Sequence, residues 1–175
     1  MSHIKYKDEI LSLSDELADV GYMAENIQVV DVDKNNLVVK RSHLDYAMTI
    51  LISFPKSVFD EIYRLDEFLS MIQVPIHCYA IFNEYSDEIA KIQKDFKKIN
   101  IVFDDFDEFK ELYGTEIVTG SMAGDLCKSI FLISKDGAIF YIDILDDLEK
   151  SFDLERLQVE LNKAYVTYTG VGCHG

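Results

Sequence analysis

Uninterrupted apolar runs divide the middle of the chain into strands, at 46–53, 75–82 and 99–104. Such runs are typical of inner strands that are covered on both faces of a sheet. Apolar residues at helical spacing predict a helix between the first two runs, beginning at Val58 and ending near Ile72. A second amphipathic helix is predicted over 86–99, with Ser86 as its N-cap. The order strand, helix, strand, helix, strand indicates an α/β fold.

The flanking segments add two hairpins and two helices to this core. A polar turn from Asp33 to Asn36 joins two short strands, and a second turn ending at Gly137 joins another pair. The flanking elements are expected at 27–40 (hairpin), 107–114 (helix ending at Gly114), 115–125 (loop), 129–144 (hairpin) and 153–165 (helix). These elements predict a three-layer α/β fold with a central mixed sheet and an N-terminal hairpin. We expect one domain over 1–166 and a glycine-rich tail over 167–175.

Composition and charge narrow the classes of function. The 175 residues are 49% hydrophobic, which suits one sizeable core. The sequence has no apolar run long enough to span a membrane and begins with a polar segment, so we expect a cytoplasmic protein. Asp and Glu number 32 against 17 Lys and Arg, and the formal charge of −15 would repel nucleic acid and anionic membranes. The acidic residues are spread along the chain, as on a solvated surface.

Three cysteines are present, at positions 78, 127 and 173, and they form no CxxC pair. An odd number in this spacing argues against a disulfide framework and a structural zinc site. Cys78 lies inside an apolar strand, so burial is the simplest interpretation. Cys127 follows a glycine-containing loop, and Lys128 beside it would favour the thiolate. Cys173 and His174 end the tail, where a thiol beside an imidazole is a weak candidate for a soft metal.

No nucleotide fingerprint, phosphate-binding loop, HExxH or GxSxG motif occurs, so no cofactor is expected.

Two segments of the chain resemble a known family. VGYMAENIQVVDVDKNNLVV resembles the opening of the bacterial thiol peroxidase subfamily of peroxiredoxins, and YGTEIVTGSMAGDLCKSIFLISKDGAIFYIDIL resembles a later segment of the same proteins. The resemblance covers roughly Tyr6 to Ala164, and its strength lies in the order and spacing of the motifs. It implies a thioredoxin-like fold, thiol-dependent reduction of hydroperoxides and a homodimer.

The family's peroxidatic cysteine lies at the first turn of a helix, where amide groups and a nearby arginine favour the thiolate. The matching stretch is SFPKSVFDEIYR, with three residues fewer. Phe59 then falls on the cysteine, Arg64 on the arginine, and Lys128 on the position of a second arginine. Lys56 and Ser57 fall on the preceding Thr-Pro pair. No cysteine occurs before Cys78, and the predicted helix at 86–99, where the family carries its resolving cysteine, has none.

Three functions are compatible with this pattern. In the first, the protein has lost peroxidase activity and is a binding or regulatory module for a protein partner or a small apolar ligand, because Phe59 has no nucleophilic atom. In the second, it is a thiol-dependent hydroperoxide reductase that uses Cys127 or Cys173. In the third, it is an interaction protein whose acidic faces recruit a basic partner. Arg64 and Lys128 would hold an anion at the helix N-terminus, unless Arg64 pairs with Asp60 or Asp66 of its own helix.

Overall fold

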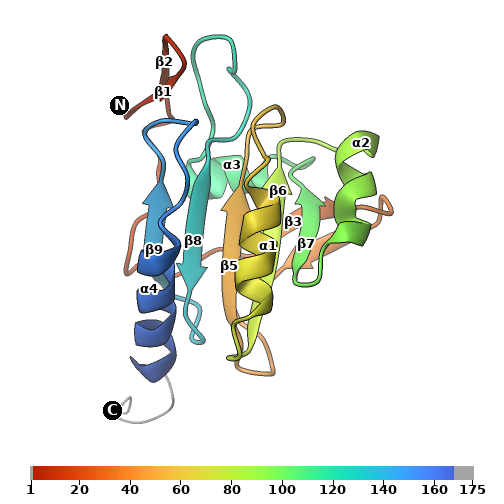
Figure 1. The fold of residues 1–175 in the computed structure, drawn as a ribbon, viewed down its shortest axis with the longest axis vertical. Coiled ribbons are helices and arrows are strands. Elements are labelled where there is room, and N and C mark those ends of the chain that lie inside the picture. Colours follow the sequence, from red (N-terminus) through yellow and green to blue (C-terminus); the bar gives the residue numbers. More distant parts are fainter. Residues whose placement is uncertain (1, 168–175) are drawn as a thin grey trace.

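A seven-stranded mixed sheet forms the centre of the computed structural model, which describes residues 2–167 (Figure 1). Its strands lie in the order β4-β3-β7-β6-β5-β8-β9. β5, β6 and β7 are mutually parallel neighbours, and every other pairing is antiparallel. The strands are β3 (Ile27–Asp31), β4 (Asn36–Val39), β5 (Met48–Ser53), β6 (Ile76–Phe82), β7 (Ile99–Phe103), β8 (Ser129–Ile133) and β9 (Ile139–Ile144).

Helices cover both faces of the sheet, which gives three layers. Helices α1 (Ile62–Ser70) and α4 (Leu154–Thr167) lie on one face, and α3 (Glu108–Tyr113) lies on the other (Figure 1). Consecutive residues of β5 point to opposite faces of the sheet. Ile50 packs in the cluster under α1 and α4, whereas Leu51 packs in the cluster under α3. All six residues of β5 are buried. The predicted three-layer α/β architecture with a central mixed sheet is therefore confirmed.

Most strands and both flanking hairpins lie where the apolar pattern predicts them. The helix α3 ends as expected at Gly114, whose φ of +71° and close approach to the backbone of Glu16 leave no room for a Cβ atom. Ser86 caps the next helix as predicted, since its hydroxyl accepts a hydrogen bond of 3.3 Å from the amide of Ile89.

The second predicted helix, 86–99, is wrong in length. Only α2 (Asp87–Ala90) is α-helical, and a 3₁₀ helix, η1 (Lys91–Asp95), follows it. Side chains stop the helix and turn the chain into β7. Asp66 accepts hydrogen bonds of 2.9–3.0 Å from the amides of residues 97–99, and Gln93 bonds the backbone of Ile99 and Ile101. These tertiary contacts override a helical apolar spacing.

An additional hairpin precedes the sheet. Strands β1 (His3–Tyr6) and β2 (Glu9–Ser12) pair with each other, and the weak alternation of this segment did not predict them. Ile4 and Leu11 of this hairpin pack with Ile117 and Cys127 in a third apolar cluster. The hairpin therefore covers the region between the loop after α3 and the beginning of β8.

No helix within residues 2–167 has the length and apolar character needed to cross a lipid bilayer.

Candidate functional site

The turn between β5 and α1, residues 54–61, is the segment that the sequence assigns to the site. It lies at the carboxyl end of β5, where parallel strands commonly present functional groups. Hydrogen bonds from Val58 N–H to the oxygen of Pro55 and from Ile62 N–H to the oxygen of Phe59 shape it. The helix α1 therefore begins at Ile62, and the prediction of a helical start at Val58 is wrong. Val58 and Phe59 pack on different apolar clusters, which the turn allows.

A buried carboxylate fixes the first half of this turn. Asp125, in the loop after α3, accepts a hydrogen bond of 3.0 Å from the amide of Lys56 and one of 2.8 Å from its neighbour Leu126. Burial raises the pKa of Asp125, and these two amide donors partly offset that effect. The side chain of Asp125 thus ties the glycine-containing loop to the backbone of the turn. The sequence alone did not single out Asp125.

Phe59 is half-buried and packs its ring edge-on against Phe82 at the end of β6. The ring centroids lie 5.3 Å apart, and the rings are inclined at 87°. This contact belongs to the cluster under α1 and α4. The side chain at the position aligned with the peroxidatic cysteine therefore anchors the turn to the core by packing.

Glu61 joins the two cations that the sequence proposed for an anion. Its Oε1 lies 2.6 Å from Nζ of Lys128, and its Oε2 lies 2.5 Å from Nη1 of Arg64. Oε2 also accepts a hydrogen bond of 2.8 Å from the amide of Phe152. The side chains of Glu61 and Lys128 are only 6% and 5% exposed, whereas that of Arg64 is 49% exposed. The carboxylate of the protein itself occupies the place between the cations.

This arrangement decides the alternatives that the sequence left open for Arg64. Arg64 does pair within its own turn and helix, but with Glu61 rather than with Asp60 or Asp66. The spacing of three residues between Glu61 and Arg64 was a visible signal for this pair. The partner Lys128 comes from the beginning of β8, so that contact needed the tertiary fold. Lys128 also donates a hydrogen bond of 2.6 Å to the backbone oxygen of Lys150.

Two small polar pockets flank the turn, and Ser57 lines both. The first, of about 300 Å³, is bordered by Asp60, Glu61, Lys128 and Glu149. The second, of about 200 Å³, lies between the turn and the loop that contains Asp125. Their walls carry hydroxyl, carboxylate and ammonium groups, and no cysteine lines either pocket. Such walls suit a polar group better than an apolar ligand.

The cysteines that the structure describes are buried. Cys78 and Cys127 have no solvent exposure, and burial raises the pKa of each thiol to about 12. Lys128 does not favour a thiolate at Cys127, because its ammonium group is bound to Glu61. This environment argues against a nucleophilic role for Cys127. Cys173 and His174 lie outside the described residues. Within 2–167 no group of His, Cys, Asp or Glu is arranged to hold a metal ion.

The fold and the position of the turn define the thioredoxin-like architecture of peroxiredoxins. A peroxiredoxin-like protein from Aquifex aeolicus superposes with a TM-score of 0.82 at 15% identity, over 94% of this chain and 98% of that chain. A thiol peroxidase from Chromobacterium violaceum gives 0.81 at 17% identity, over 95% and 98%. The mitochondrial 2-Cys peroxiredoxin from Plasmodium falciparum gives 0.63 at 15% identity, over 89% and 99%.

No family model and no curated sequence matches the chain. At these identities the likeness is one of fold, and it confirms the resemblance to thiol peroxidases and peroxiredoxins at that level.

Proposed function

We propose that this chain is a peroxiredoxin-like protein without peroxidase activity, and that it serves as a binding module at the turn between β5 and α1. One observation carries the proposal: Phe59 fills the aligned nucleophile position with a ring packed on Phe82. A phenyl ring has no atom that can attack a peroxide or be oxidised to a sulfenic acid.

The surrounding groups support the same conclusion. A peroxidatic thiol depends on cations that stabilise its thiolate. Here Arg64 and Lys128 share the carboxylate of Glu61, which offsets one of their two positive charges and holds both groups in ion pairs. With pKa values near 12, the thiols of Cys78 and Cys127 would be ionised in roughly one molecule in 10⁵ at pH 7. That population is too small to provide a peroxidase with its nucleophile.

The ligand that fits the turn best is a polar, positively charged group. Asp60 and Glu149 are exposed at the border of the larger pocket, whereas the nearby Lys128 is neutralised by Glu61. A Lys or Arg side chain of a basic protein partner would find complementary charge there. This proposal combines the binding module with recruitment of a basic partner, and it disfavours the small apolar ligand that Phe59 suggested in the sequence.

Hydroperoxide consumption tests the loss of activity. The purified full chain is supplied with thioredoxin, thioredoxin reductase and NADPH, beside a variant that carries Cys127→Ser and Cys173→Ser. We expect neither protein to consume peroxide above the protein-free background, with circular dichroism verifying the fold of both. Turnover that disappears in the variant would refute the proposal and assign the reaction to a new thiol.

The alternative enzyme rests on Cys173, which the burial of Cys127 and Cys78 leaves as the remaining thiol. Single Cys127→Ser and Cys173→Ser variants separate the two positions in the same assay. The homodimer that the resemblance implies stays a prediction, and light scattering on the same preparation measures it.

A further inference from the structure

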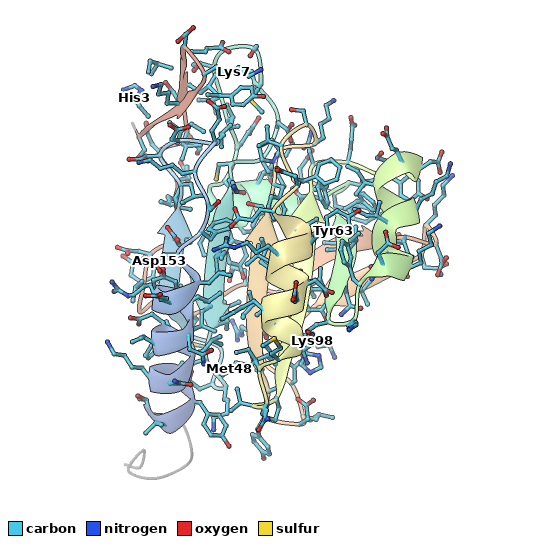
Figure 2. The ribbon with its side chains drawn as sticks, in the orientation of Figure 1. His3, Lys7, Met48, Tyr63, Lys98 and Asp153 are labelled. Atoms are coloured by element: carbon cyan, nitrogen blue, oxygen red, sulfur yellow. The ribbon has the colours of Figure 1, made fainter. Side chains whose placement is uncertain are left out.

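An open groove lies at the amino ends of β5 and β6, at the end of the sheet opposite to the turn between β5 and α1. It has a volume of about 740 Å³, and its border includes Lys40, Arg41, His43 and His77. Figure 2 shows Met48, the first residue of β5, and Lys98 toward this end, whereas Tyr63 lies near the beginning of α1. The groove is therefore separate from the turn that carries the proposed function.

Positive charge is concentrated here on a chain that is acidic as a whole. An adjoining pocket of about 420 Å³ shares Asp45 and His77 with the groove and adds Lys97 and Lys98. Four of the 17 Lys and Arg residues thus border the two pockets, and Asp45 is the one carboxylate among the described residues that line them. Asp66 lies behind this surface, but it is 5% exposed and its oxygens are bonded to amides.

These four cations are not neutralised by the rest of the described chain. Within residues 2–167, no acidic side chain forms an ion pair with Lys40, Arg41, Lys97 or Lys98, although Arg41 donates a hydrogen bond of 3.1 Å to the oxygen of Ala24. In this respect they differ from Arg64 and Lys128. Unpaired cations beside a groove raise the local concentration of anions, even when the net charge of the protein is negative.

Two stacked imidazoles lie between these cations. The ring centroids of His43 and His77 are 3.9 Å apart, and the rings are inclined at 29°. Nε2 of His43 lies 2.8 Å from the hydroxyl of the buried Thr49, and Nε2 of His77 lies 3.0 Å from Oδ2 of Asp45. Two imidazolium rings at this distance repel each other, so the doubly protonated pair needs a nearby anion beyond the single charge of Asp45.

The charges that face His43 agree with this reading of the pair. Burial lowers its pKa most, followed by the proximity of His77; Asp45 raises it, and Lys40 lowers it. An added anion would act in the same direction as Asp45. Protonation of the pair and binding of an anion are therefore linked, and each should strengthen the other.

We propose that this groove binds a small molecule through a multivalent oxyanion, such as a phosphate ester or a pyrophosphate group. Lys40, Arg41 and the histidine pair supply the charge and the donors for that group, and Lys98 of the adjoining pocket adds positive charge beside it. The fully exposed Leu44 at the border offers apolar contact to an organic portion. The ligand carries more than one negative charge, because a single carboxylate, Asp45, already accompanies the histidines.

Nuclear magnetic resonance of the histidine rings tests the proposal on the full chain. Ring signals are followed between pH 5 and pH 8, with and without millimolar inorganic pyrophosphate, at ionic strength matched by sodium chloride. We expect pyrophosphate to raise the pKa of His43 by about half a unit or more, since binding and protonation are linked, and to change the ring signals of His77 as well. The ring signals of His3, which lies in the β1–β2 hairpin at the far end of the molecule (Figure 2), should not respond to pyrophosphate and serve as the internal control.

Calorimetric titration with pyrophosphate gives the affinity, for the wild-type chain and for a Lys40→Ala, Lys98→Ala variant. Removal of two unpaired cations should weaken binding by about tenfold or more. A Lys91→Ala, Lys163→Ala variant changes the net charge equally at exposed positions elsewhere and should stay within about twofold of wild type. Glycerol 2-phosphate as a second probe distinguishes a phosphate ester from free pyrophosphate.

Equal shifts of all histidine signals, or equal weakening in both lysine variants, would mean general charge screening and would overturn the proposed site. Absence of measurable binding by either probe would overturn it as well. Neither result bears on the loss of peroxidase activity, because the groove and the α1 turn lie at opposite ends of the sheet.

Discussion

Asp104 directly follows the last residue of β7, Phe103, and has no solvent exposure. Its Oδ1 accepts a hydrogen bond of 2.7 Å from the amide of Phe109, and its Oδ2 accepts one of 3.0 Å from the amide of Lys110. Asp107, at the N-cap position of α3, makes no side-chain cap bond, so Asp104 supplies the cap from outside the helix. Burial outweighs these donors and raises the pKa of Asp104 to about 6.

This raised pKa predicts a defined dependence of stability on pH. Between the ordinary pKa of an aspartate and about 6, the folded state binds more protons at Asp104 than the unfolded state does, so this group lowers stability as pH rises through that window. The effect is at most about 3 kcal/mol. We expect Asp104→Asn, which cannot ionise, to gain stability relative to wild type as pH rises from 4 to 6.5, by up to that amount.

Urea unfolding of both proteins at several pH values measures this difference, in which the contributions of the other titratable groups cancel. Asp8→Asn, in the exposed turn between β1 and β2, is the matched control and should show no comparable trend. A difference between wild type and Asp104→Asn that is constant with pH would show that folding does not raise the pKa of Asp104.

Single residues also mark what the sequence could not reveal. The alignment placed Phe59, Arg64 and Lys128 around one site, and the structure brings Arg64 and Lys128 together on a common partner. For that partner, Glu61, the sequence offered only its spacing from Arg64, which pairs it with one of the two cations. Its role depends on contact with β8 and with the segment before α4, and no local pattern contains that information.

The turn before α1 combines a well-fixed backbone with a phenyl ring at the position of the proposed binding module. Its backbone is fixed by Asp125 and by internal hydrogen bonds, while Glu61 offsets part of the positive charge that Arg64 and Lys128 would offer a thiolate. We therefore expect that Phe59→Cys alone would yield a thiol with an ordinary or raised pKa. Combined with Glu61→Gln, which releases both cations, the same thiol should have a pKa lower by about one unit or more.

Ultraviolet absorbance of the thiolate, followed against pH, measures both values. Phe59→Cys with Glu149→Gln is the control, because Glu149 is an exposed acid that lines the same pocket. Loss of Glu61 leaves Lys128 buried without its counter-charge, at a cost of about 3 kcal/mol, so circular dichroism must verify the fold. An equal thiol pKa in all three variants would show that the Glu61 contacts do not control this position.

At the level of helices and strands, the apolar pattern correctly predicted those elements whose position depends on burial alone. β5, β6 and β7 are uninterrupted apolar runs because they are covered on both faces, and such runs can be recognised from the sequence alone. The bounds of the helices could be predicted from the sequence only in part. α1 begins four residues later than the apolar spacing indicated, and the helix after Ser86 ends early, because Glu61, Asp66 and Gln93 make hydrogen bonds to distant backbone.

Charge in the whole molecule is distributed unevenly between the two ends of the sheet. The pocket at the α1 turn is bordered by Asp60 and Glu149, and the groove at the other end is bordered by Lys40 and Arg41. The excess of 32 acidic over 17 basic residues is spread over the remaining surface. Composition revealed the net charge but not this polarity, because the four cations of the groove and its adjoining pocket come from segments nearly sixty residues apart.

The net charge of −15 predicts that salt stabilises the protein. Like charges repel most in the compact state, and raising sodium chloride from about 0.02 to about 0.3 M shortens the screening length from about 20 Å to about 6 Å. The ion pairs of buried Glu61 should be screened much less than the exposed carboxylates. We expect the midpoint of thermal unfolding at pH 7 to rise by a few degrees, equivalent to about 1 kcal/mol for a chain of this size.

Choline chloride at the same ionic strength is the control for this experiment, since a screening effect does not depend on the identity of the cation. Phosphate and sulfate are avoided, because they would bind the proposed groove and strengthen burial independently of screening. A midpoint that falls with sodium chloride would show that attractive ion pairs outweigh the repulsion. The acidic excess would then be so well dispersed, or so well paired, that it sets the solubility of the protein without limiting its stability.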